Sequence, residues 1–124
     1  MTLYDVSKIL SCEVFCGEKD LNSAVEYGCA SDLMSDVLAF SRAEALLLTG
    51  LVNNQTIHTA FIAEIKAIVF VRGKRPDIEI VALASEKKIP LLGTPFSMYE
   101  ACGILYKNGL VPTMECITSK SSNG

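Results

Sequence analysis

The sequence predicts an α/β fold, with three α/β/α layers around a mostly parallel sheet of about four to six strands. Residues 67–109 read in turn as apolar strand, amphipathic helix, apolar strand and helix. This alternation is typical of a parallel sheet that is covered by helices. Residues 45–48 are almost purely apolar, as expected for a central parallel strand that is buried on both faces.

The composition predicts one globular domain, which we place at residues 1–118, followed by a flexible tail at 119–124. Half of the 124 residues are apolar and a fifth are charged, as is usual for a protein with a packed core. No apolar run approaches the roughly 20 residues that cross a bilayer. The first ten residues lack the pattern of a secretory signal. We therefore expect a cytoplasmic protein that does not contact membranes.

The first third of the chain predicts two helices and two strands. Thr2 is placed to cap a short helix, and residues 13–16 and 24–29 follow as strands, the second with a weaker pattern. A further helix is expected to begin at Ser31. The apolar residues expected to face inward from this helix are Leu33, Met34, Val37, Leu38 and Phe40.

The middle of the chain predicts a strand, a helix and a second strand. The apolar strand 45–48 ends at Thr49 and Gly50, and Asn53 or Asn54 is placed to cap the helix that follows. Residues 67–71 form the next strand, and residues 72–76 form the turn after it. The buried side of the helix is expected to carry Ile57, Phe61, Ile62 and Ile65.

The last third predicts two helices and two strands. One helix begins near Pro76, a strand covers 89–92, and Ser97 caps the next helix with capping-box spacing to Glu100. This last helix ends near Asn108 and Gly109, and residues 110–116 form an edge strand. The face of the first helix expected to be buried carries Ile78, Val81, Ala82 and Ser85.

Cysteine and histidine usage gives no sign of catalysis or metal binding. The five cysteines include no CxxC pair, so we expect buried free thiols rather than a disulfide framework. His58 is the single histidine and lies inside a predicted helix without a recognisable catalytic partner. No catalytic residue, metal ligand or cofactor is predicted.

Charge is distributed unevenly along the chain. The net charge is −3, with nine acids and three bases in residues 1–64 and five acids and eight bases in residues 65–124. A nucleic-acid-binding protein would show a strongly basic face, so that class is not expected. Two interpretations stay open for the basic second half, a local anion site or solvated helix faces.

Polar residues follow four predicted parallel strands, and we expect their turns to meet at one edge of the sheet. Helix N-termini and backbone amides at that edge attract anions. One interpretation is a pocket for a phosphate-bearing metabolite or nucleotide; the other is that polar residues only terminate the strands. No Walker loop and no GxGxxG is present. The candidate ligand-binding residues are Thr49, Gly50, Asn53, Asn54, Arg72, Gly73, Lys74, Arg75, Thr94 and Ser97, with Ser31 at the first turn.

The segment AIVFVRGKRPDIEIVALASEKKIPLLGTP resembles the DRTGG-domain family. The pattern is an apolar strand, a short glycine turn, Arg-Pro, a helix, and then Ile-Pro followed by Thr-Pro. The family includes domains of CBS-domain pyrophosphatases and relatives of the N-terminal domain of HPr kinase/phosphorylase. The resemblance covers about residues 25–109. The Asp-Arg position of the family falls near Asn53 and Asn54, and its Thr-Gly-Gly turn falls at Val71, Arg72 and Gly73, so one glycine is kept.

The resemblance implies a non-enzymatic regulatory or ligand-sensing domain that is often homodimeric. Kinase activity is not implied, because the kinase relatives carry their phosphate-binding loop in a separate domain. The alternative is a protein–protein interaction module, which the mean hydropathy of +0.35 favours. Similar stand-alone members suggest a link to hydrogenase or electron-transfer systems in anaerobes. A weaker third hypothesis is an enzyme that uses the same crevice.

Overall fold

Six strands and five α-helices make up the part of the chain that the structure describes, residues 1–113. The strands are Glu13–Cys16 (β1), Tyr27–Ala30 (β2), Leu46–Thr49 (β3), Ala67–Phe70 (β4), Leu91–Gly93 (β5) and Val111–Pro112 (β6). The helices are Leu3–Ile9 (α1), Met34–Phe40 (α2), Asn54–Ile62 (α3), Ile78–Glu86 (α4) and Met98–Lys107 (α5), with a 3₁₀ turn at Glu18–Asp20 (η1). Within residues 1–113, none of the helices is long and apolar enough to cross a membrane.

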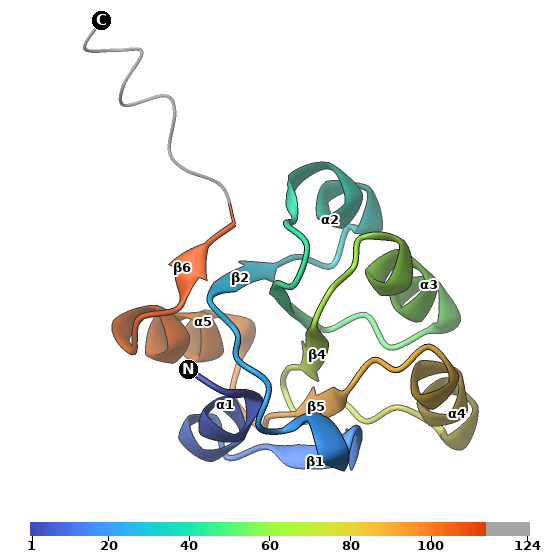
Figure 1. Ribbon diagram of the computed structural model, residues 1–124, viewed down its shortest axis with the longest axis horizontal. Helices are drawn as coiled ribbons and strands as arrows, with labels where there is room; N and C mark the ends of the chain where they lie inside the picture. The colour runs from blue at the N-terminus through green and yellow to red at the C-terminus, as the bar shows by residue number, and fades with distance from the viewer. Residues whose placement is uncertain (114–124) are drawn as a thin grey trace, which may run out of the picture.

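The sheet of this computed structural model has the strand order β1-β5-β4-β3-β2-β6. Strands β2 to β5 pair in parallel, β6 pairs in parallel with β2, and β1 runs antiparallel to β5. The chain moves in one direction from β2 to β5, so right-handed crossovers put α2, α3 and α4 on one face. The connection from β5 to β6 returns across the sheet, which puts α5 on the other face beside α1 (Figure 1).

Alternation along the strands divides the core into two layers. In β4, Ile68 and Phe70 pack with the α2, α3 and α4 side of the sheet, whereas Ala67 and Val69 pack with the α1 and α5 side. All four residues are fully buried. Because side chains alternate between the faces of a strand, both faces of β4 are covered by apolar layers. The predicted three-layer α/β/α fold is therefore confirmed.

Several predicted helix signals are present. The Thr2 hydroxyl accepts the N–H of Asp5, and the Asp5 carboxylate accepts the N–H of Thr2, which forms a capping box at α1. Ser97 caps α5, and Gly109 follows that helix with a φ of +100°. Of the predicted final strand 110–116, residues 110–113 lie in the described chain, and β6 covers two of them, Val111–Pro112. Residues 114–116 and the predicted tail 119–124 lie outside it.

The predicted start of α2 was wrong, and its predicted buried face was wrong in part. The helix begins at Met34, after Leu33, rather than at Ser31, whose hydroxyl instead accepts the N–H of Leu33 in a local turn. Met34 and Val37 are buried. By contrast, Leu33, Leu38 and Phe40 are each more than half exposed. A helix of seven residues buries only a narrow stripe, so most of its apolar residues stay in solvent.

The predicted buried faces of α3 and α4 need similar corrections. In α3, Ile57 is buried, but Phe61 and Ile62 are exposed. In α4, the buried residues are Ile80 and Ala84, whereas Ile78 is 84% exposed and Ala82 and Ser85 are also exposed. Residues 78–84 are apolar on nearly every side of the helix. The spacing of the apolar residues therefore did not indicate which side packs against the sheet.

The corrected core leads to a paired stability prediction. Phe70→Ala removes a fully buried ring from a central strand, and we expect a loss of about 3–5 kcal/mol in unfolding free energy. Ile78→Ala removes an exposed side chain and should change the same quantity by less than about 0.5 kcal/mol. Urea denaturation followed by circular dichroism measures both. Equal losses in the two variants would contradict the assignment of the core.

Candidate functional site

The carboxyl ends of β2, β3, β4 and β5 open at one edge of the sheet, which we call the rim. The rim consists of the turns at residues 31–33, 50–53, 71–77 and 94–97. The four strands are parallel, so the predicted meeting of these turns at a common edge is confirmed. The antiparallel strand β1 begins at the same edge, with Glu13 opposite Gly93.

Asp32 ties the first two turns of the rim together. Its Oδ1 atom accepts the hydroxyl of Thr49 at 3.0 Å and the N–H of Gly50 at 2.7 Å. The Thr49 hydroxyl in turn accepts the N–H of Leu51 at 3.1 Å. Hydrogen bonds to a carboxylate are stronger than those between neutral groups. Asp32 therefore fixes the β2 turn against the β3 turn, while its Oδ2 atom accepts no hydrogen bond from residues 1–113.

Arg72 occupies a backbone conformation that disfavours its side chain. Arg72 and Gly73 both have positive φ, at +58° and +69°, and the N–H of Lys74 donates to the carbonyl of Val71. These are features of a type I′ turn, in which glycine or asparagine usually fills the Arg72 position. The Arg72 N–H also donates to the carbonyl of Phe96 at 2.7 Å. A strained non-glycine residue at a strand end is a feature that clusters at functional sites.

Gly50 lies between the charged groups of Asp32 and Arg72. A Cβ atom added at Gly50 would lie 3.5 Å from Nη2 of Arg72 and 3.6 Å from each carboxylate oxygen of Asp32. Among residues 1–113, the Arg72 guanidinium forms no ion pair with any carboxylate. The rim thus combines an exposed cation and a fixed carboxylate around a position without a side chain. We call Asp32, Thr49, Gly50 and Arg72 the rim site.

Arg75 lies at the β1 side of the rim, where its guanidinium forms an ion pair with Glu13. Its Nη1 and Nη2 atoms bind the two carboxylate oxygens of Glu13, the second at 2.8 Å, and its guanidinium packs over the ring of Phe15. The hydrogen bonds from Arg75 lower the pKa of Glu13 and raise the pKa of Arg75 itself. Lys74 and Gly73 line a separate small depression with Arg75. The sequence had predicted that Arg72 and Arg75 lie together in one site. The structure does not bring them together, because the Arg75 guanidinium is bound to Glu13.

The other predicted site residues mainly hold the turns in place. The Asn53 side chain accepts the N–H of Thr56 and caps α3, and Asn54 is the first residue of that helix. Thr94 is fully buried, and its hydroxyl donates to the carbonyl of Leu10 at 2.6 Å. The Ser97 hydroxyl accepts the N–H of Glu100 at 3.1 Å. The side-chain oxygens of Asn53, Thr94 and Ser97 therefore already form hydrogen bonds within the fold.

Asp32 was not among the site residues predicted from the sequence. Its position two residues after the end of β2 was a usable signal, because polar residues just beyond parallel strands line the ligand-binding edge. No group of His, Cys, Asp and Glu within residues 1–113 is arranged to hold a metal ion.

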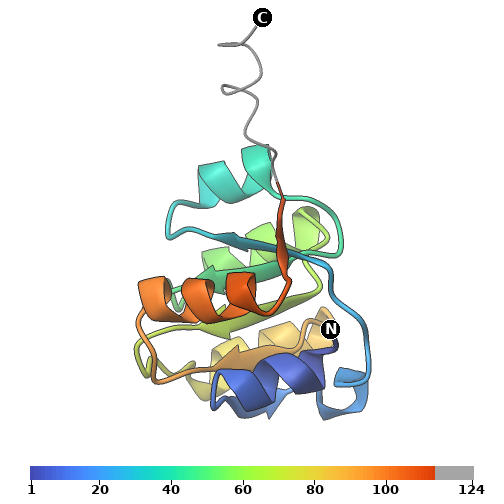
Figure 2. The same cartoon turned by 90° about the vertical axis from the view of Figure 1, so that its left-hand side faces the viewer.

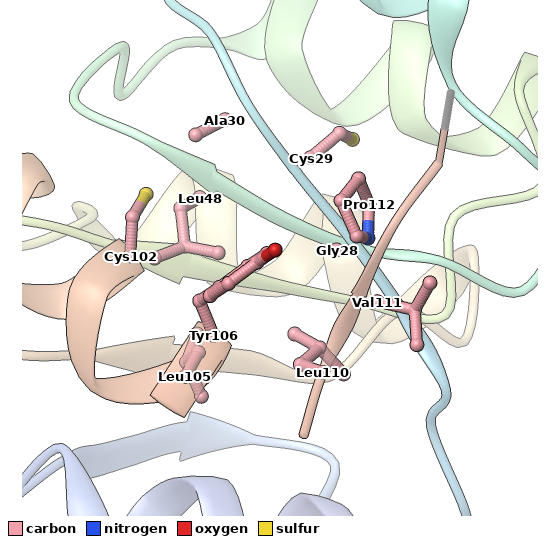
Figure 3. Close-up of a pocket in the computed structure, with 10 residues that line it drawn as sticks. All are labelled: Gly28, Cys29, Ala30, Leu48, Cys102, Leu105, Tyr106, Leu110, Val111 and Pro112. Atoms are coloured by element: carbon pink, nitrogen blue, oxygen red, sulfur yellow. The ribbon is translucent and has the colours of Figure 1, made fainter. Parts of the chain in front are cut away.

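An apolar groove lies away from the rim site, between β2 and α5 (Figure 3). It has a volume of about 120 Å³, and its walls include Gly28, Ala30, Cys102, Tyr106 and Leu110. Gly28 leaves room for the side chain of Leu110, because a Cβ atom there would lie 2.6 Å from its Cδ2. Among residues 1–113, no charged group lines the groove. The groove therefore suits an apolar side chain rather than a phosphate.

Comparison with known proteins gives a family match and a structural likeness. The model of the DRTGG domain matches residues 5–107. The chain is also similar to the crystal structure of the CBS and DRTGG domains of the regulatory region of Clostridium perfringens pyrophosphatase, complexed with the activator diadenosine tetraphosphate. The TM-score is 0.72 at 16% identity over 89% of this chain and 48% of that one, so the chain spans about half the length of that structure. No curated protein sequence matches.

The thiols beside the groove lead to a prediction on reactivity. Burial raises the pKa of Cys29 to about 11, with a further contribution from Cys102, and burial also raises the pKa of Cys102. Because the thiolate is the reactive form, iodoacetamide should label Cys29 slowly at pH 8 and faster as the pH rises toward about 11. Peptide mass spectrometry resolves the Cys29 and Cys102 products. Labelling of the native protein at the same rate as the urea-unfolded protein would contradict this picture.

Proposed function

The chain belongs to the DRTGG-domain family, and from this premise we propose that it is a regulatory, ligand-sensing domain that binds a phosphate-bearing metabolite or nucleotide at the rim site. The observation that carries the proposal is the Arg72 guanidinium, which stands without an ion-pair partner in residues 1–113 beside the open backbone at Gly50. A guanidinium binds phosphate oxygens through two parallel hydrogen bonds. The left-handed backbone at Arg72 holds this cation at the end of β4.

The N-terminus of α3 adds to the positive potential of the rim. Asn53 satisfies the N–H of Thr56, which leaves the earlier N–H groups of this nine-residue helix for other acceptors. The helix dipole places partial positive charge at the same end. An anion held by Arg72 would therefore lie near a second favourable field at the β3 turn.

Asp32 narrows the class of proposed ligand from any phosphate to a phosphate that also carries hydroxyl groups. A carboxylate repels a phosphate group, but its free Oδ2 atom accepts hydrogen bonds from hydroxyl groups. Oδ1 is already used by Thr49 and Gly50. A ligand that carries both a phosphate and neighbouring hydroxyls, such as a nucleotide or a sugar phosphate, matches the cation and the acceptor together.

The likeness to the clostridial regulatory region supports a sensing role. That structure contains an activating dinucleotide, diadenosine tetraphosphate, and it includes CBS domains as well as a DRTGG domain. The part of that structure that is similar to this chain supports the fold. The proposal that this chain binds a ligand rests on its own rim-site residues. We propose no reaction for the chain, because its rim presents a binding arrangement without a paired nucleophile and base.

A protein-interaction role is a second candidate, and exposed apolar residues on α3 and α4 favour it. Phe61 and Ile62 of α3 are 51% and 68% exposed, and Ile78 of α4 is 84% exposed. The two helices pack side by side on one face of the sheet (Figure 1). Co-purification with a protein that is lost in an Ile62→Ser, Ile78→Ser double variant would support this role. The link to hydrogenase or electron-transfer systems stays a prediction.

Ligand binding is tested by thermal shift and calorimetry with nucleotides, sugar phosphates and inorganic phosphate. A ligand at a hundred times its Kd should stabilise the native chain by about 2.7 kcal/mol. Arg72→Ala should weaken binding at least tenfold, because a charge-assisted hydrogen bond contributes roughly 1.5–3 kcal/mol. Asp32→Asn should weaken hydroxyl-bearing ligands while leaving inorganic phosphate unchanged or tighter.

Arg75→Ala is the matched control, because it removes the same side chain from a position that is already paired with Glu13. Ligand affinity in this variant should stay close to that of the native chain. Equal losses in Arg72→Ala and Arg75→Ala would indicate a non-specific charge effect. Absence of any shift with the whole panel at millimolar concentration would exclude the rim site.

A further inference from the structure

The residue type of Gly50 is explained neither by backbone conformation nor by packing. Its φ is not positive, so a side chain would meet no conformational penalty there. A Cβ atom at Gly50 would lie at ordinary contact distances of 3.5 Å and 3.6 Å from its three nearest atoms, whereas a Cβ atom at Gly28 would lie 2.6 Å from Leu110. The remaining use of a glycine is to leave space where a ligand approaches the backbone closely.

The open position above Gly50 is bordered by two groups of opposite charge. Its three nearest atoms are Nη2 of Arg72 and the two carboxylate oxygens of Asp32. Asp32 follows β2 and Arg72 follows β4, and Figure 2 shows the turns after these strands together at the left-hand side of the molecule. The guanidinium and the carboxylate form no ion pair with each other. A ligand that fills this position therefore contacts both groups at once.

The carboxylate of Asp32 has a fixed place, whereas the guanidinium of Arg72 can adjust. Oδ1 of Asp32 accepts hydrogen bonds from the hydroxyl of Thr49 and the N–H of Gly50, and Thr49 is fully buried. Asp32 cannot follow a displaced donor without breaking both hydrogen bonds. Arg72 is exposed, and its long side chain can follow a phosphate group. Asp32 therefore sets where a ligand hydroxyl must lie relative to the phosphate.

We infer that the rim site selects phosphate esters in which the carbon next to the phosphorylated carbon carries a free hydroxyl, and that Gly50 provides the space for these two groups. This inference rests on the proposed binding of a phosphate-bearing ligand and narrows its class. Arg72 binds the phosphate oxygens, and Oδ2 of Asp32 accepts the neighbouring hydroxyl.

The position of the phosphate on a sugar decides whether a ligand belongs to this class. Sugar 1-phosphates and nucleoside 3′-phosphates carry a hydroxyl on the next carbon. In sugar 6-phosphates and nucleoside 5′-phosphates, the phosphate is on a carbon outside the ring, and the next carbon carries the ring oxygen instead of a hydroxyl. The nearest ring hydroxyl is then one carbon farther away, so the phosphate and the hydroxyl no longer lie side by side above Gly50.

Two pairs of isomers test this class by isothermal titration calorimetry of the full chain. Glucose 1-phosphate is compared with glucose 6-phosphate, and adenosine 3′-monophosphate with adenosine 5′-monophosphate. The members of each pair have the same composition and nearly the same charge, so general attraction to cations does not separate them. The first-named member of each pair should bind at least about tenfold more tightly, because its isomer does not form the hydrogen bond to the charged Asp32.

Gly50→Ala places a methyl group between Arg72 and Asp32. The affinity for the first-named isomers should fall at least about tenfold, and their preference over the second-named isomers should shrink to within about threefold. The circular dichroism spectrum and the urea midpoint should stay close to native, because the added Cβ meets its neighbours at ordinary contact distances. Asp32→Asn should remove the same preference, because an amide nitrogen replaces the accepting Oδ2.

Gly103→Ala is the matched control, because it makes the same substitution in α5 at a position where a Cβ atom meets no atom within 4 Å. This variant should bind all four compounds with native affinity. Equal affinity for the two isomers of each pair would overturn the inference and leave the proposed function in place. A native preference in Gly50→Ala would also overturn the inference. Absence of binding by all four compounds and by inorganic phosphate would overturn both.

Discussion

Parallel pairing of β2 to β5 is the constraint on which the rest of the molecule depends. A parallel neighbour requires a crossover, and right-handed crossovers place α2, α3 and α4 on one face and α5 on the other. Both faces of the sheet are then covered, so central strands such as β4 consist of apolar residues throughout. The same pairing brings every strand-to-helix turn to one edge, where polar side chains meet.

Hydrogen bonds and ion pairs at this edge decide which charges can meet a ligand. Glu13 neutralises Arg75, whereas Asp32 is held by Thr49 and Gly50 and does not pair with Arg72. The Arg72 N–H binds the carbonyl of Phe96, next to the residue that caps α5.

Much of the fold followed from local patterns, and the errors share one cause. Apolar runs predicted β3 and β4, and the Ser97 cap predicted the start of α5. Burial of short helices was harder to predict, because α2 and α4 are apolar on several sides and have only seven and nine residues. Which stripe is buried depends on how each helix lies on the sheet. Ile78 was therefore placed in the core although it stands in solvent.

The sequence by itself determined the α/β class, the parallel order of the central elements and the presence of polar turns beyond their strands, because period, caps and turn residues act over a few neighbours. Tertiary structure decided which turn residues work together. Asp32 meets Thr49 and Gly50 from 17 and 18 positions away, and Arg75 meets Glu13 from 62 positions away. Such contacts depend on strand order and register, which local preferences do not encode. For this reason Arg72 has no ion-pair partner among residues 1–113, whereas Arg75 is paired with Glu13.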